Sequence, residues 1–158
     1  MTTPHDIALL RLAAQRIAGP GFATATDAVR WLTAAQAQDY PGAVTSIALR
    51  TESRTRQSVE VALNAGEVVR SWPMRGTLHF VLAEDLPWML GLTTGRLLAG
   101  AASRRAALGL DMHIIDPERE EALGEWVLRY FHSHGPATVK DFAWWTKLVA
   151  ADVKTGLA

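Results

Sequence analysis

The sequence contains no cysteine. This absence excludes a disulfide-stapled domain, a thiolate metal centre and a cysteine nucleophile, and it is typical of a protein from a reducing compartment. Uninterrupted apolar runs are short, as at 80–83, so no segment is expected to span a bilayer. The first residues also lack the basic start and apolar stretch of an export signal. We therefore expect a cytoplasmic protein without a membrane anchor.

Charge of one sign is not in excess either. The chain of 158 residues carries 16 basic and 16 acidic side chains and has a formal net charge of zero. This balance argues mildly against a protein that only binds nucleic acid. The charges are unevenly distributed, because residues 1–110 hold eleven arginines and eight acids, whereas residues 111–158 hold five bases and eight acids. The distribution indicates two units with different surfaces.

Several motifs of familiar enzymes are missing as well. The sequence has no Gly-x-Ser-x-Gly elbow, no phosphate-binding loop with a Gly-Lys pair and no Gly-x-Gly-x-x-Gly fingerprint. His132 and His134, together with His113, are the residues most similar to a metal-ligand set. Histidines near the end of a helix more often interact with its negative dipole end. We therefore expect no metal and no other cofactor.

Helical spacing of apolar residues dominates most of the chain. Thr26, Asp39 and Ser58 are the expected N-caps of three helices in the first part, because a side-chain oxygen there accepts a free backbone N–H. Thr138 and Asp141 form the Thr-x-x-Asp pattern of a further helix start near the C-terminus.

A different pattern interrupts these helices. Residues 68–74 and 77–82 are two β-prone runs separated by Arg75 and Gly76, which predicts a β-hairpin. Pro73 restricts the first of these strands to an edge or a bulge. Helices followed by a two-stranded hairpin are the arrangement of a winged helix.

The pattern predicts a helix-dominated α+β chain built from tandem winged-helix domains. Residues 1–82 would form the first domain, with the hairpin as its wing. Residues 83–158 would form a helical connector and the start of a second domain, which is incomplete because the sequence stops where its own hairpin should begin.

Two glutamines lie close together near the expected end of a helix. Gln36 follows Leu32 by four residues and would extend an apolar stripe if the helix continued, and Gln38 would lie about 200° away around the same helix. The two amides can face one pocket only if the backbone becomes extended near Ala37, because alternate residues of an extended chain share a side. The glutamines are therefore either structural groups at a helix end or a pair of polar groups in a pocket.

Two further groups of residues have alternative interpretations. Arg50, Arg54 and Arg56 form a short basic cluster that either is a solvated loop or contacts DNA phosphates. The adjacent Trp144 and Trp145 are expected to provide core and interface contacts, with base stacking as the alternative.

Three segments together resemble a known family. Residues 36–41 (Gln-Ala-Gln-Asp-Tyr-Pro), residues 69–79 (Val-Arg-Ser-Trp-Pro-Met-Arg-Gly-Thr-Leu-His) and residues 135–145 (Gly-Pro-Ala-Thr-Val-Lys-Asp-Phe-Ala-Trp-Trp) are similar to the AlkZ/YcaQ-like winged-helix DNA glycosylases. The resemblance implies tandem winged helices that bind double-stranded DNA. It also implies a hydrolase that cleaves the N-glycosidic bond of alkylated purines and unhooks interstrand crosslinks.

The resemblance maps the catalytic pair of this family onto Gln36 and Gln38. Asp39 is a stronger base beside them, but as an N-cap it would direct its oxygens at backbone amides. No lysine precedes Lys140, so we expect a monofunctional glycosylase without a Schiff-base step. Members of the family have three winged helices, so a chain that ended at Ala158 would be expected to be weak or inactive.

The same resemblance gives expectations for DNA contacts. Arg50, Arg54 and Arg56 would contact phosphates, and Arg75 and His79 would line the channel near the catalytic pair. His79 has a structural alternative, in which it is buried and bonded to a neighbouring backbone group. Two other functions remain open: a non-catalytic winged-helix DNA-binding or regulatory protein, and a protein-interaction domain, which the zero net charge would suit.

Overall fold

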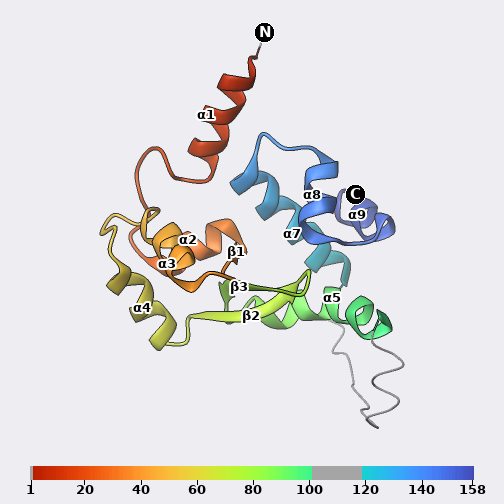
Figure 1. Cartoon of the computed structure of the whole chain (residues 1–158). Coiled ribbons are helices and arrows are strands. Elements are labelled where there is room, and N and C mark those ends of the chain that lie inside the picture. The colour runs from red at the N-terminus through yellow and green to blue at the C-terminus, as the bar shows by residue number, and fades with distance from the viewer. Residues whose placement is uncertain (1, 101–118) are drawn as a thin grey trace.

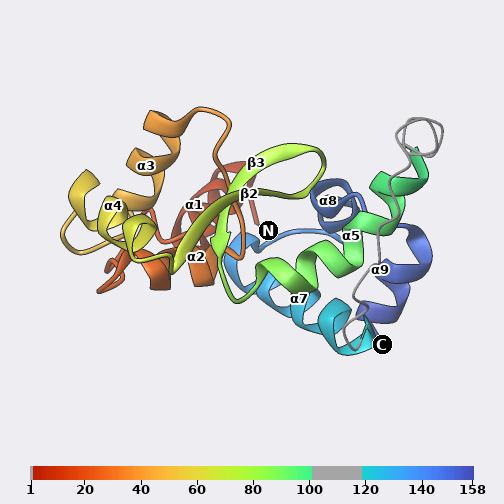
Figure 2. The ribbon, with the colours of Figure 1, turned by 90° about the horizontal axis from the view of Figure 1, so that it is seen from below.

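The computed structural model describes residues 2–100 and 119–158 of the chain. A small antiparallel sheet lies between two groups of helices, and α2 of the first group also packs against α7 of the second (Figures 1 and 2). The helix-dominated α+β class is confirmed. The first group comprises α1 (Pro4–Ala14), α2 (Ala25–Leu32), α3 (Tyr40–Ala48) and α4 (Arg56–Asn64), and the second comprises α5 (Leu86–Gly100), α7 (Arg119–His134), α8 (Val139–Thr146) and α9 (Ala150–Gly156).

The sheet has three strands in the order β1-β3-β2. The expected hairpin is present, formed by β2 (Val68–Met74) and β3 (Thr77–Leu82). Its strand with Pro73 lies at the edge, and the register shifts between Ser71 and Met74, as a proline without an N–H requires. The third strand, β1 (Ala35–Gln36), was not expected from the sequence; it pairs with the opposite edge of β3.

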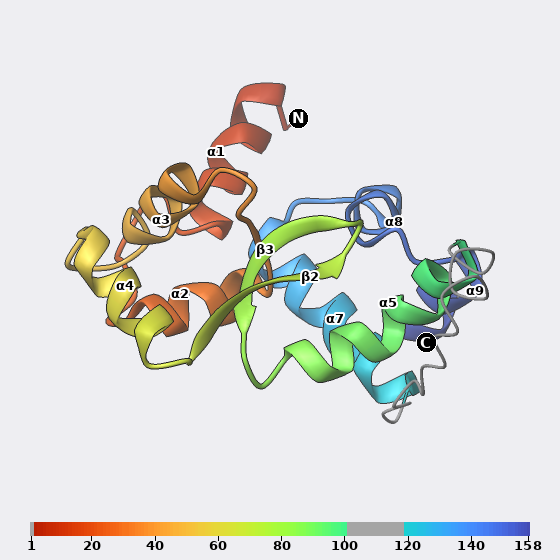
Figure 3. The ribbon, with the colours of Figure 1, turned by 60° about the horizontal axis from the view of Figure 1, so that its bottom comes forward.

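Both faces of the hairpin contribute to hydrophobic clusters. Phe80 and Leu82 pack into one cluster with residues of α2, α3 and α4. Val81 and Met74 belong to a second cluster, whose largest buried side chain is Trp126 of α7. This division follows from the strand geometry, because successive side chains point to opposite faces of a sheet. The hairpin is therefore held from both sides, and its turn is carried toward α8 (Figure 3).

The helix caps agree with the sequence analysis only in part. Thr138 and Asp141 form the expected capping box of α8. The caps of α2 and α4 are Thr24 and Thr55, in place of Thr26 and Ser58. Asp39 occupies the N-cap position of α3, but its side chain makes no capping hydrogen bond. The expected use of its oxygens on backbone amides is therefore wrong.

His113 lies outside the described residues. Among the helices of residues 2–100 and 119–158, none combines the length and the apolar character needed to cross a bilayer.

A half-buried histidine of α7 makes the stability of the chain depend on pH. The imidazole of His134 stacks on Tyr130, with ring centroids 4.7 Å apart, and burial lowers its pKa to about 4. An unfolded histidine titrates near 6.5, so between these values the unfolded state binds more protons. The contribution of His134 to stability is complete above pH 6.5 and is lost as the pH falls toward 4, with a cost of about 2 kcal/mol at pH 5.

We expect His134→Phe to flatten the fall of the melting temperature between pH 7 and pH 4.5. His132→Phe, which alters an exposed histidine of the same helix, should leave that fall unchanged. Thermal unfolding at a series of pH values checks both variants, and an unchanged slope in His134→Phe would contradict the assignment.

Candidate functional site

The two glutamines lie on a short extended segment that follows α2. The helix ends at Leu32, where Thr33 has a φ of 65° and directs the chain out of the helix. Gln36 and Gln38 are both exposed, and the Ala37 side chain between them is fully buried. Alternate residues of an extended chain point to the same side, so the condition for a shared pocket is met.

A pocket of about 270 Å³ lies where this segment meets the first turns of α3. Both amides line it, so the structure brings Gln36 and Gln38 together. Its wall combines the polar side chains of Gln36, Gln38, Asp39 and Ser46 with the apolar surface of α3. The residues that line the pocket are Gln36, Gln38, Asp39, Gly42, Ala43 and Ser46.

The hairpin fixes the position of this segment. The backbone N–H of Ala37 donates to the carbonyl of Leu78 at 2.7 Å, which continues the pairing of β1 with β3. Arg70 of β2 reaches across β3 and donates to the carbonyls of Ala37 at 2.9 Å and Gln38 at 3.1 Å. Its guanidinium also lies 5.7 Å from the centre of the Tyr40 ring. Arg70 therefore positions the backbone of the pocket, a role that the sequence analysis missed.

The amides of the two glutamines have different surroundings. Gln38 Oε1 accepts a hydrogen bond of 3.1 Å from the backbone N–H of Leu78, which fixes the orientation of its amide group. Within the described parts of the chain, no protein group is hydrogen-bonded to the Gln36 side chain. One amide is thus held by the hairpin, and the other is available to a ligand or a water molecule.

Arg50 does not occupy the position expected of a phosphate contact. Its side chain is buried, and all three guanidinium nitrogens donate to protein oxygens. The acceptors are the backbone and side-chain oxygens of Gln15 and both oxygens of Ser46, at 2.6–3.2 Å. A guanidinium held in this way cannot turn toward DNA, so Arg50 instead ties the end of α1 to the wall of the pocket.

The other two arginines of the cluster remain on the surface. Arg54 is exposed and has a φ of 52°, in a loop where its N–H donates to Thr51 Oγ1. Arg56 begins α4 and forms a weak pair with Glu60 at 3.5 Å. Both arginines follow α3 in the chain, and neither lines the pocket, whose α3 wall extends from Gly42 to Ser46.

Arg75 lies at the turn of the hairpin. Both turn residues, Arg75 and Gly76, have positive φ values of 60° and 69°, as a tight two-residue turn requires. The guanidinium lies 4.9 Å from the ring centre of Trp144, which is exposed, and Lys147 lies 5.1 Å from the same ring. Trp145, by contrast, packs into the aromatic cluster around Tyr130. The two adjacent tryptophans therefore have different environments.

His79 lies inside the protein and does not line the surface. Its side chain is only 2% exposed, and its Nδ1 lies 2.8 Å from the carbonyl oxygen of Thr77. Burial lowers the pKa of the ring, because it disfavours the charged form. His79 is therefore buried and bonded to a neighbouring backbone group, as in the second of its two interpretations. In this position it stabilises the hairpin that anchors Gln38.

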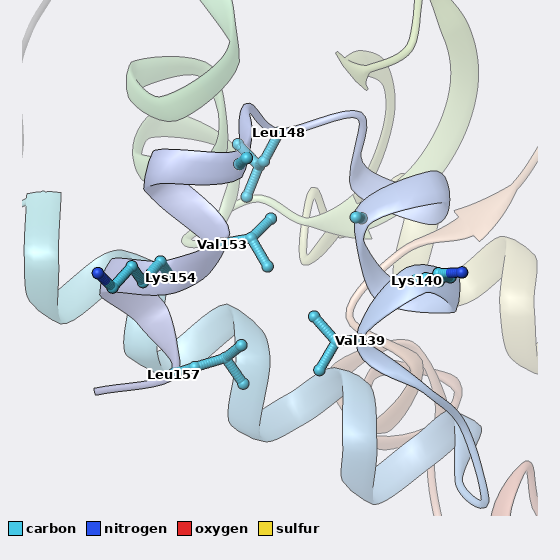
Figure 4. Close-up of a pocket in the computed structure, with 8 residues that line it drawn as sticks. Val139, Lys140, Leu148, Val153, Lys154 and Leu157 are labelled. Carbon is cyan, nitrogen blue, oxygen red and sulfur yellow. The ribbon is translucent and has the colours of Figure 1, made fainter.

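A second pocket is of a different kind. It has a volume of about 470 Å³ and lies between α8 and α9, with Val139, Leu148, Val153 and Leu157 pointing into it (Figure 4). The lysines at its rim, Lys140 and Lys154, are directed away from one another. Its lining is mostly apolar and contains no converging polar side chains, so it does not resemble a catalytic site.

The fold and the first pocket define a helix-dominated α+β protein with a site where strand β1, at one edge of the sheet, meets helix α3. Comparison with known proteins shows to which family this protein belongs. The family described as “DNA glycosylase AlkZ-like” matches residues 29–118 and 104–158. The chain belongs to this AlkZ-like DNA glycosylase family.

A solved structure has a similar fold. The chain is similar to Streptomyces sahachiroi DNA glycosylase AlkZ, with a TM-score of 0.71 and 19% sequence identity. The alignment covers 93% of this chain and 62% of that protein, so the chain spans less than two thirds of the AlkZ length. At this identity the likeness shows the fold alone. No curated protein sequence matches the chain.

Proposed function

We propose that the chain belongs to a monofunctional DNA glycosylase that hydrolyses the N-glycosidic bond of alkylated purines in double-stranded DNA. The observation that carries the proposal is that Gln36 and Gln38 share one pocket and are held there by the hairpin. Family membership supports the reaction class. Purines joined in an interstrand crosslink through N7 have the same reactive bond, so we include crosslink unhooking in the proposal.

The chemistry suits amide groups. A purine alkylated at N7 carries a positive charge and leaves readily, while positive charge develops on the sugar. Glutamine cannot ionise, but its oxygen accepts and its nitrogen donates hydrogen bonds. In the proposed site the free Gln36 oxygen accepts from the attacking water, and the oriented Gln38 nitrogen donates to it. Positioning of this kind can supply a large part of the rate. The pocket lining includes no lysine, which suits hydrolysis without a lyase step.

We further propose a winged helix at residues 1–82, formed by α2, α3 and α4 with the β2–β3 hairpin as its wing, and a second winged-helix unit within residues 83–158. The order of these elements along the chain supports this assignment. DNA would lie across the pocket, with Arg54 and Arg56 on one side and Arg75 on the other. Contacts of arginines with phosphates position a duplex without reading its sequence.

The reaction is tested with a duplex that contains one N7-methylguanine. The proposal predicts that abasic sites accumulate, and that the strand breaks only after treatment with alkali, because no lyase step occurs. A crosslinked duplex should give separated strands under denaturing conditions. Binding of both duplexes without any base loss would favour a non-catalytic winged-helix protein.

Replacement of a surface arginine should alter DNA binding selectively. We expect Arg54→Ala to weaken duplex binding several-fold and to reduce the slope of log affinity against log salt by about one, because one phosphate contact is lost. Single-turnover excision at saturating protein should change little. Fluorescence anisotropy over a range of salt concentrations measures the slope.

Arg50→Ala is the matched control for this prediction. It should lower the melting temperature, since it removes the hydrogen bonds that the Arg50 guanidinium donates to Gln15 and Ser46, and leave the salt slope of the folded protein unchanged. A reduced slope in Arg50→Ala, or an unchanged slope in Arg54→Ala, would contradict the placement of the two arginines.

A further inference from the structure

The pocket contains a carboxylate that the sequence analysis had set aside. Asp39 lines the pocket together with Gln36 and Gln38, and its side chain is exposed. It occupies the N-cap position of α3 with a φ of −89°, yet it makes no capping hydrogen bond. Among the residues that the structure describes, no side chain forms an ion pair or a hydrogen bond with this carboxylate. The negative charge of Asp39 is therefore available to a ligand in the pocket.

Two residues at the start of α3 lie beside this carboxylate. Pro41 stands at the second position of the helix and has no backbone N–H to offer. Gly42 stands at the third position, and a Cβ atom built there would collide with Asp39 Oδ2. Glycine is thus the residue that gives the Asp39 carboxylate room over the first turn of α3. The carboxylate of Asp39 therefore lies beside the amides of Gln36 and Gln38 without a capping hydrogen bond.

We infer that Asp39 is the general base of the pocket and the anion that faces the sugar of the cleaved nucleotide. This inference rests on the proposed glycosylase function. The two amides can hold a water molecule, but neither can take its proton, because an amide does not ionise. A carboxylate can do so, and a negative charge near the sugar also stabilises the positive charge that develops there.

The reaction step balances with these three side chains. The C1′–N9 bond of the N7-alkylated purine breaks, and its electron pair goes to N9, so the cationic base leaves as a neutral molecule. The oxygen of the bound water forms a bond to C1′. One proton of that water passes to the Asp39 carboxylate and from there to solvent, which leaves an abasic sugar with a hydroxyl group at C1′. The remaining hydrogen bonds of the water would be made to the Gln36 oxygen and the Gln38 nitrogen.

Asp39→Asn separates this role from a structural one. Asparagine is as good an N-cap as aspartate and has nearly the same shape, but it cannot accept the proton. We expect single-turnover release of N7-methylguanine to fall about 100-fold or more, in the range of general base catalysis, with little change in melting temperature. Asp39→Glu should recover part of the rate. A rate for Asp39→Asn equal to that of the wild type would overturn the inference.

Asp27→Asn is a matched control, because Asp27 is an aspartate in the first turn of α2 that lies outside the pocket. Its rate of base release should equal that of the wild type. An equal loss in both variants would indicate a general effect of charge and would overturn the specific role of Asp39.

A binding experiment tests the placement of the charge without any turnover. A duplex with a pyrrolidine in place of the sugar carries a positive charge near C1′, whereas a tetrahydrofuran duplex is neutral. The wild type should bind the pyrrolidine duplex at least about tenfold more tightly, and Asp39→Asn should lose most of this preference. An equal preference in both proteins would overturn the inference. Retention of an Asp39-dependent preference without base release would contradict the proposed glycosylase function alone.

Discussion

Replacing either Gln36 or Gln38 with alanine is expected to slow base excision by about 30- to 1000-fold. This range corresponds to about 2–4 kcal/mol of barrier, the usual cost of losing one preorganised polar group in an active site. Both side chains are exposed in the same pocket, so their loss removes contacts to the substrate or to water and leaves the core intact. Duplex affinity should change little, because the proposed phosphate contacts lie on other residues.

The two variants should also differ from one another. Gln38 Oε1 accepts the N–H of Leu78, so Gln38→Ala leaves that donor without its partner and should lower the melting temperature slightly. Gln36 has no such contact within the described chain, and Gln36→Ala should leave the melting temperature unchanged. If activity followed thermal stability across these variants, the glutamines would be structural groups only.

The second large effect concerns stability. Asp85, between the hairpin and α5, has a side chain only 5% exposed and forms a 2.6 Å ion pair with Arg129 of α7. Its other oxygen accepts the indole N–H of Trp88 at 2.9 Å. We expect Asp85→Ala to lower the free energy of unfolding by about 3 kcal/mol, because Nη1 of the partly buried guanidinium and the partly buried indole N–H both lose their acceptor.

Glu125→Ala provides the control for this ion pair. Glu125 also accepts from Arg129, at 2.7 Å, but its side chain is 45% exposed. Exposed pairs contribute little, so this variant should cost less than about 1 kcal/mol. Urea unfolding of both variants measures the two losses in the free energy of unfolding. Equal losses would contradict the special importance of the burial of Asp85.

The hairpin could be predicted from the sequence because its signals are local. Two β-prone runs flank Arg75 and Gly76, and the turn between them allows only one register near its ends. Strand β1 could not be predicted in the same way. It consists of two residues and exists through pairing of Ala35 with Phe80, a contact between positions far apart in the sequence.

The helix starts show a similar limit. Thr24 and Thr26 both lie near the start of the apolar stripe of α2, and Thr55 and Ser58 lie in the same way near the start of the stripe of α4. Either residue of each pair can supply a capping oxygen, and only the tertiary position of the helix selects one. At Asp39 the cap position was predicted correctly, but its side chain makes no capping hydrogen bond.

The pocket was partly predictable. Geometry alone required an extended backbone near Ala37 if the two glutamines were to share a side, and that condition is met. The burial of Arg50 was not predictable, because it depends on acceptors from Gln15, which is 35 residues away in the sequence. An arginine cluster in a sequence does not reveal which of its members is enclosed by the fold.

The most direct measurement is the release of free N7-methylguanine from a duplex with one lesion, followed by mass spectrometry under single-turnover conditions. It compares the wild-type full chain with Gln36→Ala/Gln38→Ala at protein concentrations that give equal DNA occupancy. We expect protein-dependent release of the intact base by the wild type and a loss of at least about 30-fold in the double variant. Equal protein-dependent release by the two proteins would contradict the catalytic role of Gln36 and Gln38.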